Sequence, residues 1–228
     1  MDLTEALRTT GAVRAFTGQP VSDELVWSIL DDARFAPSGG NRQAWHVIVV
    51  HDETKRTAIR DLYLDAWHDY VGHLLAGLIP FSPLASDEDR AAALAQRGAA
   101  EAVSRPDGFA ENLNEVPVML VVCADLNVLA ATDRDLDRYS IVGGASIYPF
   151  VWSVLLAARG RGLAGVLTTI ATRNEQAVRQ VLAIPSSYAV ASIVALGYPT
   201  KPPTTLSRRS VEEFTSVDHF GGEAFNPS

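Results

Sequence analysis

The chain has 228 residues, and 19 basic against 27 acidic residues give it a formal net charge of −8. This length predicts one domain, or at most two, and 47% hydrophobic with 20% charged residues is typical of a globular protein. The acidic balance argues against partners such as nucleic acid or an anionic membrane, because both need clustered positive charge. Only Lys55 and Lys201 are lysines, so 17 of the basic residues are arginines, and some of these could recognise a planar anion.

In the first half of the chain, a short helix is expected over 2–10 and a second one that Ser22 caps and that ends near Ala36, before Pro37. A loop over 37–41, a strand over 46–50 and a helix from Asp52 to Leu64 or Tyr70 follow. Residues 66–115 differ in character and predict a helical excursion, with a capping box at 86–89 before an alanine-rich helix to about Val103.

The second half predicts an apolar strand over 116–124, a long helix over 140–159 and a strand over 163–169. A capping box at Thr172 then begins a helix to Ala183, followed by a strand over 188–196 and an extended polar arm at about 200–228. Strands that alternate with helices favour an α/β sheet covered by helices, and no linker divides residues 1–228. No apolar run approaches the length of a membrane span and no basic leader begins the chain, so we expect a cytoplasmic protein.

Several segments match familiar binding motifs in whole or in part, but the residues around them do not fit the function of those motifs. Residues 160–165 match G-x-G-x-x-G, but a helix precedes them and a strand follows, the reverse of a dinucleotide site. Residues 133–144 lack the Gly and Glu of a calcium loop, and the five histidines show no zinc pair, so no metal is expected. Cys123 is central in an apolar strand and predicts a buried thiol. We therefore predict no catalytic side chain; in an enzyme of this kind a cofactor supplies the chemistry.

Four separate segments are rich in groups that bind anions or amides. They are Arg8 to Arg14, the Ser-Gly-Gly loop over 37–45, residues 167–170 at the end of a strand, and 207–210 in the tail. Arginines for a phosphate together with neutral donors for a ring describe a phosphorylated planar cofactor. Each segment alone is equally compatible with an ordinary surface.

The order of the motifs resembles the FMN-dependent nitroreductase family over nearly the whole chain. Val-Arg-x-Phe at 13–16 is followed by Ala-Pro-Ser-Gly-Gly-Asn-x-Gln-x-Trp at 36–45, and Ala-Ala-Arg-Gly-Arg-Gly-Leu at 157–163 comes before Gly-Tyr-Pro at 197–199 and a basic tail. The resemblance implies an α+β three-layer sandwich with a mainly antiparallel sheet flanked by helices. It also implies an intertwined homodimer with FMN at the interface and NAD(P)H as co-substrate.

The resemblance also implies the site. Arg14 would lie by the phosphate or the flavin pyrimidine edge, Thr168 and Thr169 near flavin N5, and Arg208 on the phosphate with Arg209 in reserve. The loop with Ser38 and Gly39 would approach a flavin held mainly by the other subunit. The expected cofactor-binding residues are Arg8, Arg14, Pro37, Ser38, Gly39, Asn41, Leu167, Thr168, Thr169, Arg208 and Arg209.

One departure concerns the phosphate. Relatives often carry two basic residues and a serine where this chain has Thr10, Gly11 and Ala12, so Arg8 is the candidate to compensate. The aromatics of the excursion, Trp67, Tyr70, Phe81 and Phe109, are candidates for the acceptor pocket. The alternative, that they only pack the excursion onto the sheet, stays open.

The implied activity is hydride transfer from NAD(P)H through flavin to a nitroaromatic or quinone, in ping-pong order. Two alternatives stay open: a reductive dehalogenase or flavin-degrading relative of the same fold, and an FMN-binding protein without turnover. The physiological acceptor, the choice of NADH or NADPH, and the proton donor are not readable from the sequence.

Overall fold

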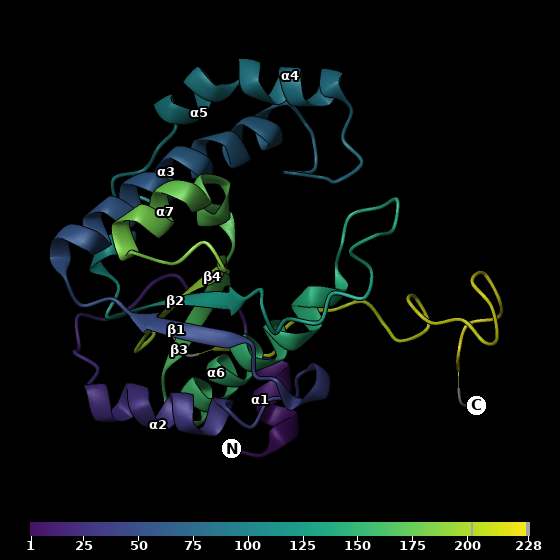
Figure 1. The fold of residues 1–228 in the computed structure, drawn as a ribbon, viewed down its shortest axis with the longest axis horizontal. Coiled ribbons are helices and arrows are strands. Elements are labelled where there is room, and N and C mark those ends of the chain that lie inside the picture. Colours follow the sequence, from purple (N-terminus) through teal and green to yellow (C-terminus); the bar gives the residue numbers. More distant parts are fainter. Residues whose placement is uncertain (202, 227–228) are drawn as a thin grey trace.

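The computed structural model describes residues 1–201 and 203–226. Its centre is a four-stranded sheet in the order β1-β2-β4-β3 (Figure 1). The strands are β1 (Trp45–Val49), β2 (Val118–Asp125), β3 (Ala164–Thr168) and β4 (Tyr188–Gly197). All three neighbouring pairs are antiparallel, so the α/β sheet that the alternating elements favour is wrong and the α+β class is confirmed. Alternation along the chain does not fix direction, because a helical connection can return the chain to either end of a sheet.

Two cores, one on each face of the sheet, make three layers (Figure 1). Along β2, Leu120 and Val122 pack with α2 (Asp23–Ala33) and α6 (Tyr148–Gly160), whereas Met119 and Val121 pack with α3 (Glu53–Leu75) and α7 (Glu175–Leu182). Successive side chains of a strand point to opposite faces, and here both faces are covered. That explains why β2 is apolar without interruption.

Three of the predicted helix caps form, at Ser22, Asp52 and Ser86. Ser22 accepts a hydrogen bond from the Leu25 amide at 3.3 Å, and Asp52 accepts one from the Lys55 amide at 2.8 Å. The Ser86 capping box closes on Asp89 and begins α4 (Asp87–Ala95), after which α5 (Arg97–Ala102) is a separate short helix. Each cap satisfies amides that have no partner inside their own helix.

Three helix boundaries differ from the prediction. Helix α3 runs on to Leu75, past Tyr70. The helix expected from 140 begins only at Tyr148, after the short η3 (Val142–Ser146). The capping box at Thr172 does not form: that hydroxyl donates to the Thr169 carbonyl at 2.7 Å within η4 (Ile170–Asn174), and α7 follows.

The N-terminal segment and the start of the C-terminal tail lie side by side. After α1 (Leu3–Thr9), the Val13 amide donates to the Gly165 carbonyl of β3 at 2.9 Å. The returning tail then runs along the same segment: the Thr200 amide donates to the Ala15 carbonyl at 3.1 Å, and the Leu206 amide to the Arg8 carbonyl at 2.9 Å. The N-terminal segment is therefore held between β3 and the tail.

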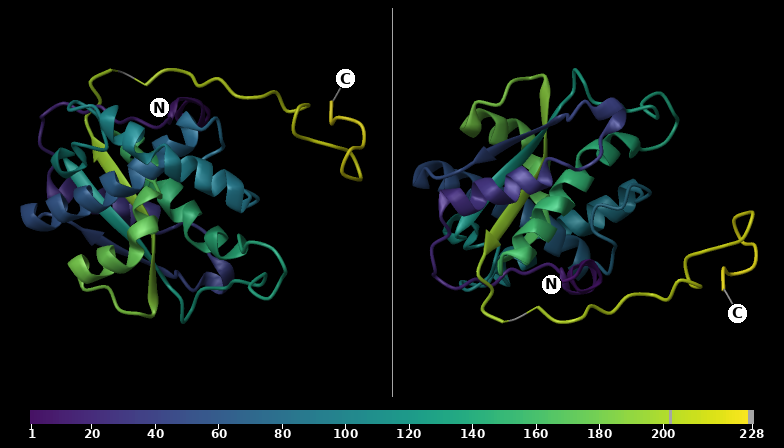
Figure 2. Two further views of the ribbon diagram at one scale, coloured as in Figure 1. Left: turned by 90° about the horizontal axis from the view of Figure 1, so that it is seen from above. Right: turned by 90° about the horizontal axis from the view of Figure 1, so that it is seen from below.

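Beyond Leu206 the chain leaves the body as an extended arm, yellow in Figures 1 and 2. Of the arm expected at about 200–228, positions 202, 227 and 228 lie outside the described residues. The described part carries five exposed apolar side chains: Val211, Phe214, Val217, Phe220 and Phe225. Within the described ranges, no helix is both long and apolar enough to cross a membrane.

Candidate functional site

The end of β3 carries a buried polar contact between two distant parts of the chain. The hydroxyl of Tyr63 on α3 lies 3.1 Å from the hydroxyl of Thr168, and both residues are buried. Burial raises the pKa of Tyr63, while the hydrogen bond with Thr168 and the nearby charge of Arg14 work in the opposite direction. We call Arg14, Tyr63 and Thr168 the strand-end half-site. It combines an exposed cation with a tyrosine that stays neutral and keeps its proton.

An aromatic row leads away from this half-site along one face of α3. Tyr63, Trp67 and Tyr70 follow the helical spacing, and the rings of Trp67 and Tyr70 stack with centroids 4.9 Å apart. Phe109 meets Tyr63 edge-on at 6.1 Å, and Phe81 lies 6.4 Å from Tyr70. The four aromatics of the predicted acceptor pocket thus join one row through Tyr63.

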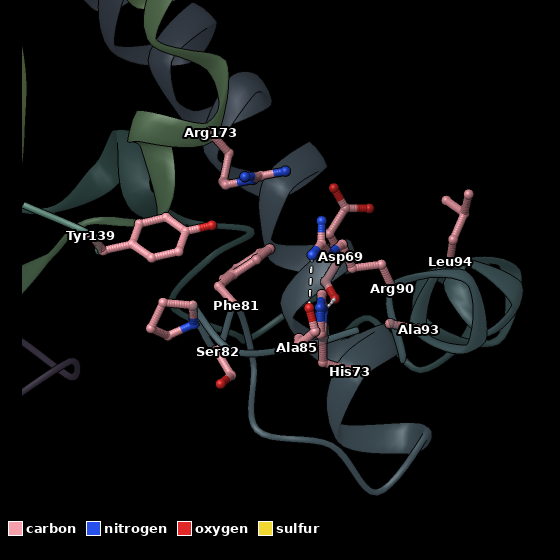
Figure 3. Close-up of a pocket in the computed structure, with 11 residues that line it drawn as sticks. Asp69, His73, Phe81, Ser82, Ala85, Arg90, Ala93, Leu94, Tyr139 and Arg173 are labelled. Carbon is pink, nitrogen blue, oxygen red and sulfur yellow. Dashed lines mark hydrogen bonds between the residues drawn. The ribbon is translucent and has the colours of Figure 1, made fainter. Parts of the chain in front are cut away.

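The row has two ends with different surroundings. Trp67 and Phe109 pack against the core between α3 and the sheet. Phe81, at the other end, lines a cavity of about 440 Å³ (Figure 3). Trp67 and Phe109 therefore contribute to packing, and the role of all four aromatics in an acceptor pocket stays a prediction.

The Ser-Gly-Gly loop lies at the opposite edge of the sheet. The Gly39 amide donates to the buried Ser146 hydroxyl at 3.0 Å, and Ser38 accepts from the Gln43 amide at 2.9 Å. Gly40 (φ 60°) and Asn41 (φ 53°) are in the left-handed region, which favours Gly and Asn. We call Ser38, Gly39 and Ser146 the loop half-site. Pro37, Gly39 and Asn41 are exposed on it.

The two half-sites do not meet within one chain. Strands β2 and β4 lie between β1, which follows the loop, and β3, which ends at Thr168. In residues 1–201 and 203–226 no hydrogen bond links the two half-sites.

The N-terminal segment and the tail together line a cavity of about 290 Å³. Its lining includes the cations Arg14 and Lys201 and the threonines Thr9, Thr200 and Thr204. Contacts within the chain already engage the Thr10 hydroxyl and cover Gly11. Thr10 is buried and donates its hydroxyl to the Ala6 carbonyl at 2.7 Å.

The space beside Gly11 is filled by a side chain of the tail. A Cβ atom at this position would lie 2.8 Å from Cδ2 of Leu206, which packs directly over the glycine. The arginines of the arm lie elsewhere: Arg208 and Arg209 are exposed, and among the described residues the Arg208 side chain donates only to the adjacent Ser207 carbonyl, at 2.7 Å. The chain ends therefore meet through their backbones, but Arg208 is not brought to Arg14 within one chain.

The remaining predicted positions have simple surroundings. Arg8 is exposed, Leu167 packs against the core, and Thr169 is exposed just beyond β3. Burial raises the pKa of Cys123 to about 11, which makes it an unreactive thiol. Among the described residues, no group of histidine, cysteine and acidic side chains is arranged to hold a metal.

Sequence reasoning missed four residues of these sites: Tyr63, Ser146, Arg173 and Lys201. The spacing of 63, 67 and 70 on one helix face was the signal for Tyr63. No local pattern marks Ser146, which meets Gly39 across 107 positions of the chain. Arg173 lies over the Phe81 ring, 4.9 Å from its centroid, and its surroundings also depend on long-range packing.

Comparison with known proteins identifies the family of this chain and several of its relatives. The model of the nitroreductase family matches residues 7–198. A nitrobenzene nitroreductase of Ectopseudomonas oleovorans is 27% identical over 94% of this chain and 96% of its own length, and a 5,6-dimethylbenzimidazole synthase of Rhodospirillum rubrum is 28% identical over 82% and 77%.

Solved structures share the fold. A BluB-like flavoprotein from Clostridium difficile 630 superimposes with a TM-score of 0.68 at 21% identity, over 96% of this chain and all of its own. The NADPH:FMN oxidoreductase of Vibrio harveyi, complexed with NAD+, gives a TM-score of 0.64 at 19% identity, over 95% and 77%.

Proposed function

Because the chain belongs to the nitroreductase family, we propose that it is an FMN-dependent oxidoreductase that passes hydride from NAD(P)H to a nitroaromatic or quinone. The observation that carries the proposal is the strand-end half-site, where the buried hydroxyls of Tyr63 and Thr168 meet and where Arg14, whose charge acts on Tyr63, lines a basic cavity. Within the described residues, no group of histidine, cysteine and acidic side chains is arranged to hold a metal instead.

The donor set fits FMN. Arg14 and Lys201 bring two positive charges to a cavity that threonines also line, which suits a phosphate dianion. Thr168 and Tyr63 offer neutral hydroxyls at the strand end, and Gly39 offers a backbone that a planar ring can approach closely. When bound, FMN would supply a ring that takes hydride from NAD(P)H and passes it on to the acceptor, which gives ping-pong order.

The chain's own residues bind and orient. Arg14 would hold the phosphate of FMN together with Lys201. Tyr63 holds the Thr168 hydroxyl in one orientation, and its raised pKa keeps it a neutral hydrogen-bond partner at physiological pH. The aromatic row excludes water from one side of the site and offers planar surfaces on which an acceptor stacks.

A homodimer completes the site. The loop half-site of one copy would meet the strand-end half-site of the other, as a twofold interface allows. The arm would bring Arg208 to the partner, and its exposed apolar side chains, such as Phe214 and Phe220, suit burial against a second copy.

Binding of FMN tests the proposal. Apoprotein is titrated with FMN and quenching of flavin fluorescence is followed. We expect Arg14→Gln to weaken affinity by about tenfold, the loss of one charge-assisted contact. Arg105→Gln, which removes an exposed arginine paired with Asp107, is the matched control. Failure of the wild-type chain to bind FMN would overturn the proposal.

The flavin-degrading alternative is favoured by one observation, the similarity to a 5,6-dimethylbenzimidazole synthase. It predicts that the protein consumes its own FMN in stoichiometric amounts under oxygen. The oxidoreductase predicts that the FMN content is constant through many turnovers.

A further inference from the structure

The cavity at the end of the aromatic row lies between the end of α3, the loop before α4, and η4 (Figure 3). One wall is aromatic, with Phe81 and Tyr139 beside Arg173, and the facing wall carries Asp69 and Arg90. A volume of about 440 Å³ is in the range of small-molecule sites. Flat walls with charged groups at the margin suit a planar ring that bears a polar substituent.

The charged side chains that line this cavity differ in how many partners they have. Asp69 is ion-paired with Arg97, so the carboxylate that faces the cavity already has a partner. Arg90 pairs with Asp87 at 3.3 Å and donates to the Ala85 carbonyl at 2.7 Å. Arg173 has no hydrogen bond or ion pair within the described residues, and its only charge-related contact is the Phe81 ring.

The position of Arg173 links the cavity to the strand-end half-site. It belongs to η4, which begins two residues after Thr168, and Phe81 joins it to the aromatic row that begins at Tyr63. A guanidinium that lies over a ring still presents its edge, and that edge is the part that grips a carboxylate in a planar, bidentate manner.

From this geometry we propose that Arg173 is a specificity-determining residue that selects an aromatic acceptor bearing a carboxylate. The ring would lie against Phe81 and the carboxylate would meet the guanidinium. The inference rests on the proposed function, since the cavity is assigned here to the acceptor of that reaction. It goes beyond it by naming the substrate class.

The test compares two acceptors of the same shape, para-nitrobenzoate and para-nitrobenzamide, with the FMN-loaded enzyme. We expect Arg173→Gln to raise the KM for the carboxylate by about tenfold, and to change the KM for the amide by less than about twofold. Arg173→Lys keeps the charge and should recover part of the difference, while Arg105→Gln should leave both constants unchanged. The preference for the carboxylate should also fall as salt is added.

A binding measurement separates this inference from the proposed function. Benzoate and benzamide undergo no reduction, and their binding to wild type and Arg173→Gln is measured by calorimetry whether or not the enzyme turns over. Weaker binding of benzoate alone in the variant supports the inference. Equal loss for both ligands, no loss for either, or an increase confined to the KM for NADPH would overturn it.

Discussion

The hydroxyl of Tyr63 lies 3.1 Å from the hydroxyl of Thr168, and this contact fastens the long helix α3 to the end of β3. The two residues are 105 positions apart, and both are buried. The contact places the start of the aromatic row against the strand end where the flavin is proposed to bind. Its consequences for stability and activity can be measured separately.

Replacing Tyr63 with Phe keeps the ring and removes the hydroxyl, which leaves the Thr168 hydroxyl without this partner. We expect a loss of about 1–2 kcal/mol in the free energy of unfolding, the usual effect of an unpaired buried polar group. The catalytic constants should also change: we expect a higher KM for the acceptor, a lower kcat, or both. Tyr70→Phe is the stability control, because the Tyr70 hydroxyl has no hydrogen bond in the described residues. Equal stability of the two variants would show that the contact contributes nothing.

Packing of Leu206 over Gly11 predicts that a side chain at position 11 displaces the tail. A valine there would overlap Leu206, whose Cδ2 lies 2.8 Å from the Cβ position. Because Leu206 is the far end of a flexible side chain, we expect a stability change below about 1 kcal/mol but a faster loss of FMN on dialysis. Gly18→Val is the control, since a Cβ at Gly18 meets nothing within 4 Å. Identical FMN retention in both variants would contradict a role for the tail.

Cys123 should be inert in the folded protein. Burial raises the pKa of its thiol from 9.0 to about 11, so at neutral pH almost no thiolate is present. We expect no reaction with a thiol reagent at neutral pH and one equivalent after unfolding. The folded chain holds this proton more tightly, so the associated stability is complete below pH 9 and is lost as the pH rises through about 11. Rapid labelling of the native protein would contradict the buried position.

Two inactive variants should restore each other if the site is shared. Arg14→Ala damages the strand-end half-site, and Gly39→Val damages the loop half-site, where a Cβ would lie 3.3 Å from the Ser146 hydroxyl. In a mixed dimer one of the two sites has neither change, so co-refolded variants should reach about a quarter of wild-type activity. Recovery no greater than the sum of the separate variants would mean that each chain builds its own site.

Local signals in the sequence were enough for much of the fold. The caps at Ser22 and Asp52 act within one helical turn, and the uninterrupted apolar strand over 116–124 reflects a core on both faces. The alternation of strands and helices did not predict strand direction, because direction depends on how long connections return to the sheet; the family resemblance implied the antiparallel sheet. For the candidate site, the sequence indicated Arg14 and Thr168 individually. Their link through Tyr63 was not predictable, because it depends on packing between distant segments.

The most direct measurement of the central claim is an anaerobic pair of half-reactions on the FMN-loaded protein. NADH or NADPH is added first, and a nitroaromatic is added after the excess donor has been consumed. The account predicts that the flavin absorbance bleaches with the donor and returns with the acceptor, because the two substrates react in turn at one site. Yellow protein that never bleaches would instead describe an FMN-binding protein without turnover, and would contradict the proposed oxidoreductase.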